Sequence, residues 1–328
     1  NGLADNDSVE ICVYAIEMVY IPQGSFKLGD NFETSLSTNS RNFFHAGGGS
    51  ITPFTVTSEN ELTIGNVNNT QLWATAQQGV AGTLPANFPK GFAGFYIMKY
   101  ELSQFMYKEF LLKLTRDQQL TRAYHAAGIN RYMYGNTTTP WNRNGIKFVS
   151  DASGFNPRIY INDLNNNGIP NEESDGQDIA CNYISFLDHL SFGDWCGLRP
   201  FTELEFEKAC RGILNPVTGG EFPWGTTIIQ NVTSITNPNT STEIAGNASA
   251  NSVYGNHGSV QGPMRSGNFA RNSTSREQAG ASYYGVMDLG GNLWEYVYTI
   301  RNTGNREFNG SVHGDGVLTS TGENKPLR

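Results

Sequence analysis

The chain has 328 residues, of which 38% are hydrophobic and 12% aromatic, so it is long and apolar enough to bury the core of one large domain. Only 16% of the residues are charged and the formal net charge is −8, without a basic patch, which argues against nucleic acid as a partner. No apolar run reaches the roughly 18 residues that a membrane span needs, so none is predicted.

The first half of the chain predicts short strands and one helix. Residues 9–21 and 95–100 combine β-branched and aromatic residues in the manner of strands. The intervening region 31–90 is rich in Asn, Ser, Thr and Gly, which predicts a long loop with short strands. Ser103 precedes apolar residues at helical spacing and predicts a helix over 103–114.

Two more helices are predicted in the second half. Ser185 and Thr202 begin the capping patterns S-x-x-D and T-x-x-E, which predict helices over 185–196 and 202–211. Leu187 is expected on the buried face of the first of these. We expect a single domain over 1–328, of the α/β (α+β) class, with much irregular structure in three long insertions: 31–90, 121–180 and 226–282.

Four separated blocks carry a recognisable pattern. They are MVYIPQGSFKLGD at 18–30, GFYIMKYELSQFMYKEFL at 94–111, ISFLDHLSFGDWCGLRPFTELEFEKACRG at 184–212, and GVMDLGGNLWEY at 285–296. In this order they resemble the blocks of the formylglycine-generating enzyme (sulfatase-modifying factor) family. The resemblance spans 18–296 and implies a C-type-lectin-like α/β fold with two helices and small sheets.

Several large or charged side chains are expected to be architectural. In the family that the chain resembles, the counterparts of Arg199, Glu203 and Glu205 join a buried ionic network, and buried charges persist only when they are paired. A core with little regular structure also needs large anchors. Three tryptophans are expected to provide them: Trp195, Trp224 and Trp294.

The last block implies a calcium site. The family binds calcium through its G-N-x-W-E loop, so the ligands here would be the carboxylates of Asp288 and Glu295 and the backbone carbonyls of Gly291 and Leu293. Such hard oxygens suit Ca²⁺. A second family site begins with an Asn and its following carbonyl, for which residues 247–248 are the counterpart, without a convincing acidic partner downstream.

Another candidate calcium loop is independent of the family. Asp163, Asn165 and Asn167, followed by Gly168, form a D-x-[DN]-x-[DN]-G head, in which oxygens at alternate positions converge on one point. Ser174 stands where an EF-hand has its last ligand, so the loop is closer to those of extracellular repeat proteins. An Asn- and Gly-rich turn without metal is the alternative.

The cysteines argue against the catalytic chemistry of the family. Its enzymes bind Cu(I) through two cysteines shortly after an R-G-G-S strand, and soft thiolates suit that metal. No cysteine follows the counterpart of this strand, 309–311. The four cysteines lie elsewhere and lack metal-ligand spacing: Cys12, Cys181, Cys196 and Cys210. Family domains continue beyond the point that corresponds to Arg328, so we expect the end of the domain to be missing.

Three functions follow from these observations. The first is a secreted or cell-surface module that binds a protein or glycan partner through its long loops. The second is a self-assembling or structural subunit of an extracellular assembly, as in gliding and secretion lipoproteins of Bacteroidota, which resemble this family. The third is a formylglycine-generating copper oxidase whose cysteine pair lies beyond Arg328. We favour the two non-enzymatic functions, with Ca²⁺ as the expected cofactor.

Overall fold

The computed structural model describes residues 8, 13–29, 45–50, 52–73, 80–124, 128–151, 156–170, 172–213, 219–254 and 261–323. Within these residues the protein has four α-helices, one 3-10 helix and five small sheets, which confirms the mixed α/β class. In this described part of the chain, no helix is long and apolar enough to cross a membrane.

Three helices begin where the sequence predicts. Their N-caps and bounds are Ser103 before α1 (Gln104–Lys113), Ser185 before α3 (Phe186–Trp195) and Thr202 before α4 (Glu203–Arg211). At α3, the Ser185 hydroxyl accepts the Asp188 N–H, and the Asp188 carboxylate accepts the Ser185 N–H. These reciprocal bonds satisfy donors that a helix start leaves without an intrahelical partner, and α4 repeats the arrangement.

The region after α1 contains more regular structure than predicted. α2 (Arg116–Arg122) begins at a capping box on Thr115, only two residues after α1 ends. A three-stranded antiparallel sheet then follows, with the order β11–β10–β9: Ile159–Asn162, Ile146–Ser150 and Arg131–Tyr132. The prediction of a loop was wrong here because these strands are short and lie among Asn and Gly residues, whose composition dominates a local pattern.

The remaining sheets are small, and the predicted strand segments 9–21 and 95–100 form one of them. β1 (Met18–Ile21) pairs antiparallel with β8 (Phe95–Met98). Three other sheets have the orders β2–β4 (Phe26–Leu28, Phe54–Val56), β3–β6–β5–β7 (His45–Ala46, Leu72–Trp73, Leu62–Ile64, Gly82–Leu84) and β12–β13 (Ile235–Thr236, Ile244–Ala245). The 3-10 helix η1 spans Thr303–Glu307.

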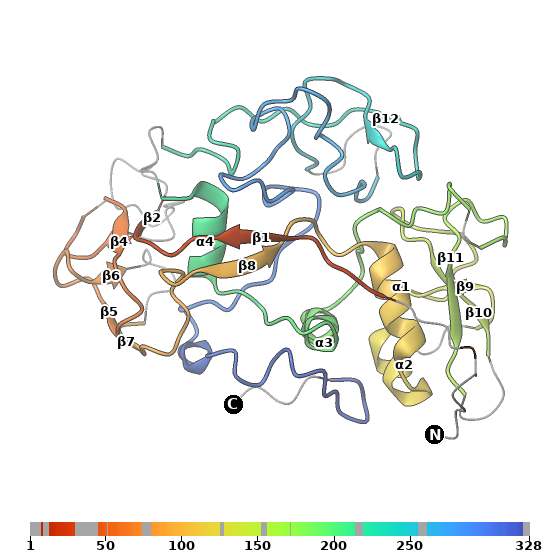
Figure 1. Cartoon of the computed structure of the whole chain (residues 1–328), viewed down its shortest axis with the longest axis horizontal. Coiled ribbons are helices and arrows are strands. Elements are labelled where there is room, and N and C mark those ends of the chain that lie inside the picture. Colours follow the sequence, from red (N-terminus) through yellow and green to blue (C-terminus); the bar gives the residue numbers. More distant parts are fainter. Residues whose placement is uncertain are drawn as a thin grey trace.

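The β1–β8 pair lies between two main hydrophobic clusters (Figure 1). One cluster packs β2 and β4–β7 against α4 and includes Leu204 and Tyr298. The other packs α1 and α3 against β10 and β11 and includes Phe110 and Phe192. A smaller cluster joins Ile21 of β1 and Ile97 of β8 to Ala209 of α4.

Two predictions about buried side chains were wrong. Trp224 is buried, as expected, but Trp294 is 91% exposed and cannot anchor the core. Leu187 is 47% exposed, because α3 turns this position toward solvent. The expected ionic network is confirmed for Arg199, whose guanidinium makes two bonds to the buried Glu205 carboxylate, at 2.9 and 2.5 Å.

Candidate functional site

The last of the four sequence blocks forms a tight turn, which we call the GGN loop (residues 288–295). Asp288, Gly291 and Asn292 have positive φ angles of 59°, 123° and 63°. Asp and Asn tolerate this region better than most other residues. A Cβ at Gly291 would lie 2.4 Å from the hydroxyl oxygen of Ser252, so the close approach of the loop requires glycine.

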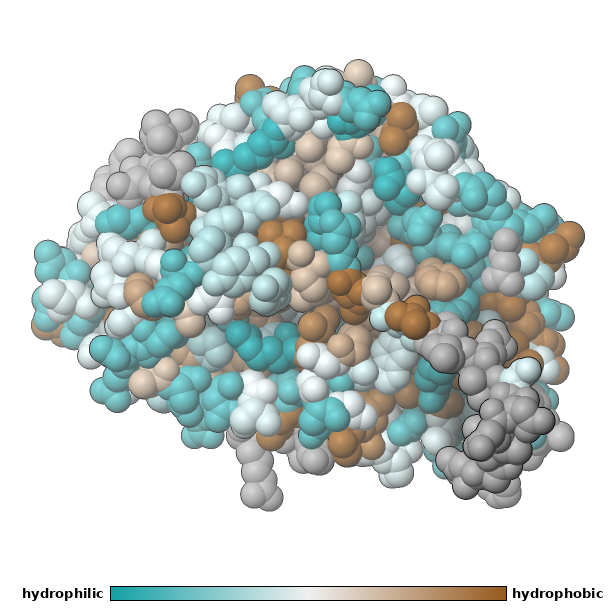
Figure 2. All heavy atoms as spheres, in the orientation of Figure 1, coloured by the Kyte–Doolittle hydropathy of each residue, from teal (hydrophilic) through white to brown (hydrophobic). Residues whose placement is uncertain are grey.

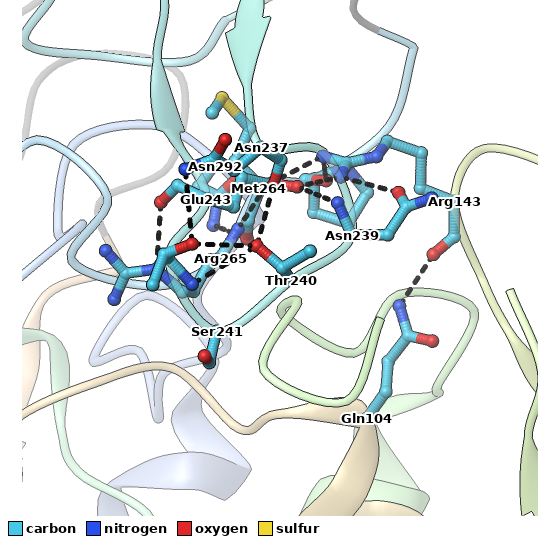
Figure 3. Close-up of polar contacts among 12 residues, drawn as sticks. Gln104, Arg143, Asn237, Asn239, Thr240, Ser241, Glu243, Met264, Arg265 and Asn292 are labelled. Atoms are coloured by element: carbon cyan, nitrogen blue, oxygen red, sulfur yellow. Dashed lines mark hydrogen bonds and ion pairs between the residues drawn. The ribbon is translucent and has the colours of Figure 1, made fainter. Parts of the chain in front are cut away.

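Side chains from distant parts of the chain hold the GGN loop. Asn292 forms a two-way contact with Met264: its Oδ1 accepts the Met264 N–H at 2.8 Å and its Nδ2 donates to the Met264 carbonyl at 3.2 Å (Figure 3). The same Nδ2 donates to Glu101 Oε2 at 2.5 Å, and the Leu293 N–H donates to Glu101 Oε1 at 3.0 Å. Glu101 follows β8, so one carboxylate connects the loop to the central strand pair.

A buried ion pair lies beside these contacts (Figure 3). Glu243 is fully buried, and both of its carboxylate oxygens contact the guanidinium of Arg143. Glu243 also accepts the N–H of Asn239 at 2.7 Å and the N–H of Arg265 at 3.0 Å. Arg143 and Glu243 belong to different predicted insertions, so their ion pair joins these two insertions. The contact lies close to Met264, the residue before Arg265.

Three buried carboxylates lie close to one another at the GGN loop. Burial, reinforced by the charges of Asp288 and Glu295, holds the pKa of Glu101 well above its usual range. Burial also raises the pKa of Glu295 to about 8 and that of Asp288 to about 6. Placing carboxylates in the interior is costly unless a proton or a cation neutralises them.

The donor set of the GGN loop fits a hard divalent cation. Glu295 Oε1 is buried without a hydrogen-bond partner in the described part of the chain. The carbonyl oxygens of Gly291 and Leu293 likewise accept no hydrogen bond from the described residues. Asp288 uses Oδ2 to accept the Gly267 N–H at 2.6 Å. Carboxylate and carbonyl oxygens of this kind are the hard ligands that Ca²⁺ prefers.

The carboxylates alone do not form a metal centre. Over the described residues, no group of three or more His, Cys, Asp or Glu side chains is arranged to hold a metal ion. A cation at the GGN loop would therefore depend on carbonyl oxygens as much as on Asp288 and Glu295. Calcium binding at this loop stays a prediction.

The predicted ligands Asp163, Asn165 and Asn167 also share one turn. Asn165 Oδ1 accepts the Asn167 N–H at 3.0 Å, and Asp163 Oδ2 accepts the Gly168 N–H at 3.1 Å. The ammonium group of Lys147 contacts the buried Asp163 carboxylate at 2.6 Å. A calcium ion bound by Asp163 would have to share this carboxylate with Lys147 or displace it, and calcium binding here also stays a prediction.

Asn247, the counterpart of the first residue of the second family site, forms hydrogen bonds to nearby backbone groups. Asn247 Oδ1 accepts the Thr233 N–H at 2.9 Å, and its Nδ2 donates to the Asn231 carbonyl at 2.9 Å. The structure thus gives the Asn247 side chain a clear role in joining two neighbouring segments of the 226–282 region.

The described cysteines are separate thiols. Cys181, Cys196 and Cys210 form no disulfide, and Cys12 lies outside the described residues. Burial raises the pKa of all three thiols, that of Cys196 to about 12. A thiol with a raised pKa stays protonated at neutral pH, whereas the metal ligand and the nucleophile are the thiolate.

A groove of about 550 Å³ lies next to the GGN loop, and we call it the β8 groove. Its walls are mostly apolar, and most of the lining residues come from four stretches: 95–102, 181–193, 197–201 and 286–296. In the space-filling view, hydrophobic residues gather near the middle of the face where β1 and β8 lie (Figure 2). Aromatic residues around the groove include Tyr96, Tyr183 and Tyr296, all of which are exposed.

Sequence reasoning missed Glu101 and the β8 groove. Glu101 belongs to the second family block, in the run Lys99-Tyr100-Glu101, but nothing in that run indicates its contact with Leu293. The available signal was an acidic residue at the junction of a predicted strand and a predicted helix. The groove arises from segments far apart in the sequence, and no local pattern predicts it.

Comparison with known proteins gives one match. The family model described as "Sulfatase-modifying factor enzyme 1-like domain" matches residues 10–324, nearly the whole chain. No curated protein and no solved structure matches the chain.

Proposed function

Because the chain belongs to the sulfatase-modifying factor enzyme 1-like family, we propose that it is a non-catalytic member that serves as a binding or assembly module outside the cytoplasm. The observation that carries this proposal is the β8 groove, a mostly apolar recess beside a loop rich in buried oxygens. Concave apolar sites with a few polar groups are typical of ligand binding. Within the mixed α/β class, we propose that the fold is a variant of the C-type-lectin-like fold.

The state of the cysteines supports a non-catalytic role. Copper chemistry of the expected kind needs two thiolates at one site. Cys181 and Cys196 belong to the hydrophobic cluster around α1 and α3, whereas Cys210 lies at the end of α4. Burial favours the neutral thiol at all three. These cysteines are suited to packing rather than to soft-metal binding.

Calcium is part of the proposal. Asp288 and Glu295, with the carbonyl oxygens of Gly291 and Leu293, would hold Ca²⁺ at the GGN loop, and Glu101 would keep the loop in place. The bound ion would supply the positive charge that the buried carboxylates lack. The Asp163 loop is the second proposed calcium site.

The proposed partner is a protein or glycan at the cell surface. Alternatively, copies of this protein assemble with one another into an extracellular structure. The low charge content and the long Asn- and Thr-rich loops favour an extracellular setting. A net charge of −8 disfavours nucleic acid. The gliding and secretion lipoproteins of Bacteroidota are the members with which we compare it.

The catalytic alternative is a formylglycine-generating copper oxidase, which the family name supports. The test is incubation of the protein with a Cys-x-Pro-x-Arg peptide, with and without copper, followed by mass spectrometry. We expect the peptide mass to stay unchanged. Copper-dependent conversion of the peptide cysteine to formylglycine by this chain would refute the non-catalytic proposal.

A further inference from the structure

A lysine, an aspartate and an asparagine meet at the turn formed by residues 163–168. Lys147 lies in β10, the central strand of its sheet, directly opposite Tyr132 of β9. Its ammonium group contacts Asp163 Oδ2 at 2.6 Å and donates to Asn166 Oδ1 at 3.1 Å. One nitrogen atom thus lies within hydrogen-bond reach of both a carboxylate and the carbonyl oxygen of a carboxamide.

Burial and hydrogen bonding hold these side chains in place. Asp163 and Tyr132 are fully buried, and Lys147 is only 7% exposed. The Tyr132 hydroxyl lies 2.9 Å from Asn166 Oδ1 and 2.8 Å from the Asp163 carbonyl oxygen, and it can donate its proton to either oxygen. Because an ammonium group only donates, the Asn166 amide must present Oδ1 rather than Nδ2 to Lys147.

The four side chains supply the groups that an acyl transfer needs. The Lys147 nitrogen is held against the Asn166 carboxamide, so its attack is an intramolecular step. The Asp163 carboxylate lies beside that nitrogen and is placed to move its protons. A Tyr132 hydroxyl that donates to Asn166 Oδ1 stabilises the negative charge that develops there during attack. Asn166 is exposed, so a released ammonia has a direct path to solvent.

We propose that Lys147 and Asn166 join in an intramolecular isopeptide bond, which the folded protein forms without a cofactor or another enzyme. Nζ of Lys147 gives a proton to Asp163 and attacks Cγ of Asn166, while Tyr132 donates to the oxygen of the tetrahedral intermediate. The Nζ–Cγ bond forms and the Cγ–Nδ2 bond breaks. Both protons that Nζ loses pass through Asp163 to the leaving nitrogen, which departs as ammonium. Nothing is oxidised or reduced.

The crosslink goes beyond the proposed binding function, and its test involves neither calcium nor a partner. It would tie β10 covalently to the turn after β11 and so restrict the unfolded chain, as a disulfide does. It also converts the Lys147 ammonium to a neutral amide. The Asp163 carboxylate would then no longer be paired with a lysine, so the crosslink is compatible with the calcium proposed for this loop.

The first test is the intact mass of the purified, denatured protein, measured when fresh and after prolonged incubation of the folded protein. We expect a mass about 17 Da below that of the sequence, which corresponds to the loss of one ammonia. Peptide mapping should then give a branched peptide that contains both Lys147 and Asn166. A wild-type protein that keeps the full mass of its sequence after incubation would overturn the proposal.

Two lysine variants show whether the mass loss comes from this bond. Lys147→Arg keeps a cation beside Asp163 but has no nucleophilic amine, so it should keep the full mass of its sequence. The matched control is Lys113→Arg, which changes an exposed lysine and should still lose about 17 Da. A loss that persists in Lys147→Arg would overturn the proposal, because it would come from cyclisation of an asparagine instead.

The second test measures how fast the lighter mass appears. Tyr132→Phe keeps the ring but removes the hydroxyl that stabilises the intermediate, so crosslinking should be about a hundredfold slower. Asp163→Asn should stop the reaction, because an amide does not relay protons as a carboxylate does. Crosslinking of Asp163→Asn at the wild-type rate would overturn the proposed chemistry.

Discussion

Glu101 Oε1 accepts the backbone N–H of Leu293 at 3.0 Å, a contact between residues 192 positions apart in the chain. The second oxygen of the same carboxylate accepts from Asn292. One buried side chain thus fixes the GGN loop relative to β8, and the β8 groove is lined by residues from both.

Replacing Glu101 should destabilise the protein. Glu101→Ala removes the acceptor of the Leu293 N–H and one of the two acceptors of the Asn292 amide. Each buried donor left unsatisfied costs about 1–3 kcal/mol. Glu101→Gln keeps one acceptor oxygen and should lose less. Urea unfolding measures the change, with the exposed Glu61→Ala as the control. If Glu101→Ala and the control variant were equally stable, the role of Glu101 in holding the GGN loop would be contradicted.

Calcium should stabilise the protein through the GGN loop. A ligand that binds only the folded state at 100 times its Kd adds about 2.7 kcal/mol of stability. We expect the melting temperature to fall in EGTA, and Glu295→Gln or Asp288→Ala to lose most of this difference. Asp163→Asn tests the other loop separately. A wild-type protein without any calcium-dependent shift would count against both loops.

Replacing only one member of the Arg143–Glu243 ion pair should lower the stability of the protein strongly. Glu243 is fully buried, so Arg143→Met leaves a carboxylate without its cation and should cost about 3–5 kcal/mol. The double variant Arg143→Met with Glu243→Met removes both charges and should recover much of that loss. Thermal unfolding of the two singles and the double gives the coupling free energy. Additive losses would show that the two side chains do not act as a pair.

Lys208 should make stability rise with pH. Burial lowers its pKa from 10.5 to about 8, although its ammonium donates to the carbonyls of Pro22 and Gly91 at 2.6 Å. Between pH 8 and 10.5 the unfolded chain holds a proton that the folded one has lost, so its contribution to stability rises by up to about 1.4 kcal/mol per pH unit.

The control for this pH dependence is Lys208→Met, which should lower stability and remove the rise. The comparison is made by urea unfolding of both proteins at several pH values across that interval. Parallel stability profiles for the two proteins would contradict the assignment to Lys208.

Much of the secondary structure could be predicted because its signals are local. Ser103, Ser185 and Thr202 each cap a helix through a contact only three residues along the chain. The family blocks likewise predicted the β1–β8 strands and the position of the GGN loop. The strands β10 and β11 were not predicted, because they form a sheet through their pairing rather than through a distinctive composition.

The sequence by itself therefore determined the family and the main helices. The four oxygen donors of the GGN loop stay a prediction. Only the tertiary structure decided that Glu101 joins that loop, that Trp294 lies in solvent, and that an apolar groove lies next to the loop. The physical reason is range: capping and turn preferences depend on neighbours a few residues away, whereas burial and hydrogen-bond satisfaction depend on which distant segments the folded chain brings together.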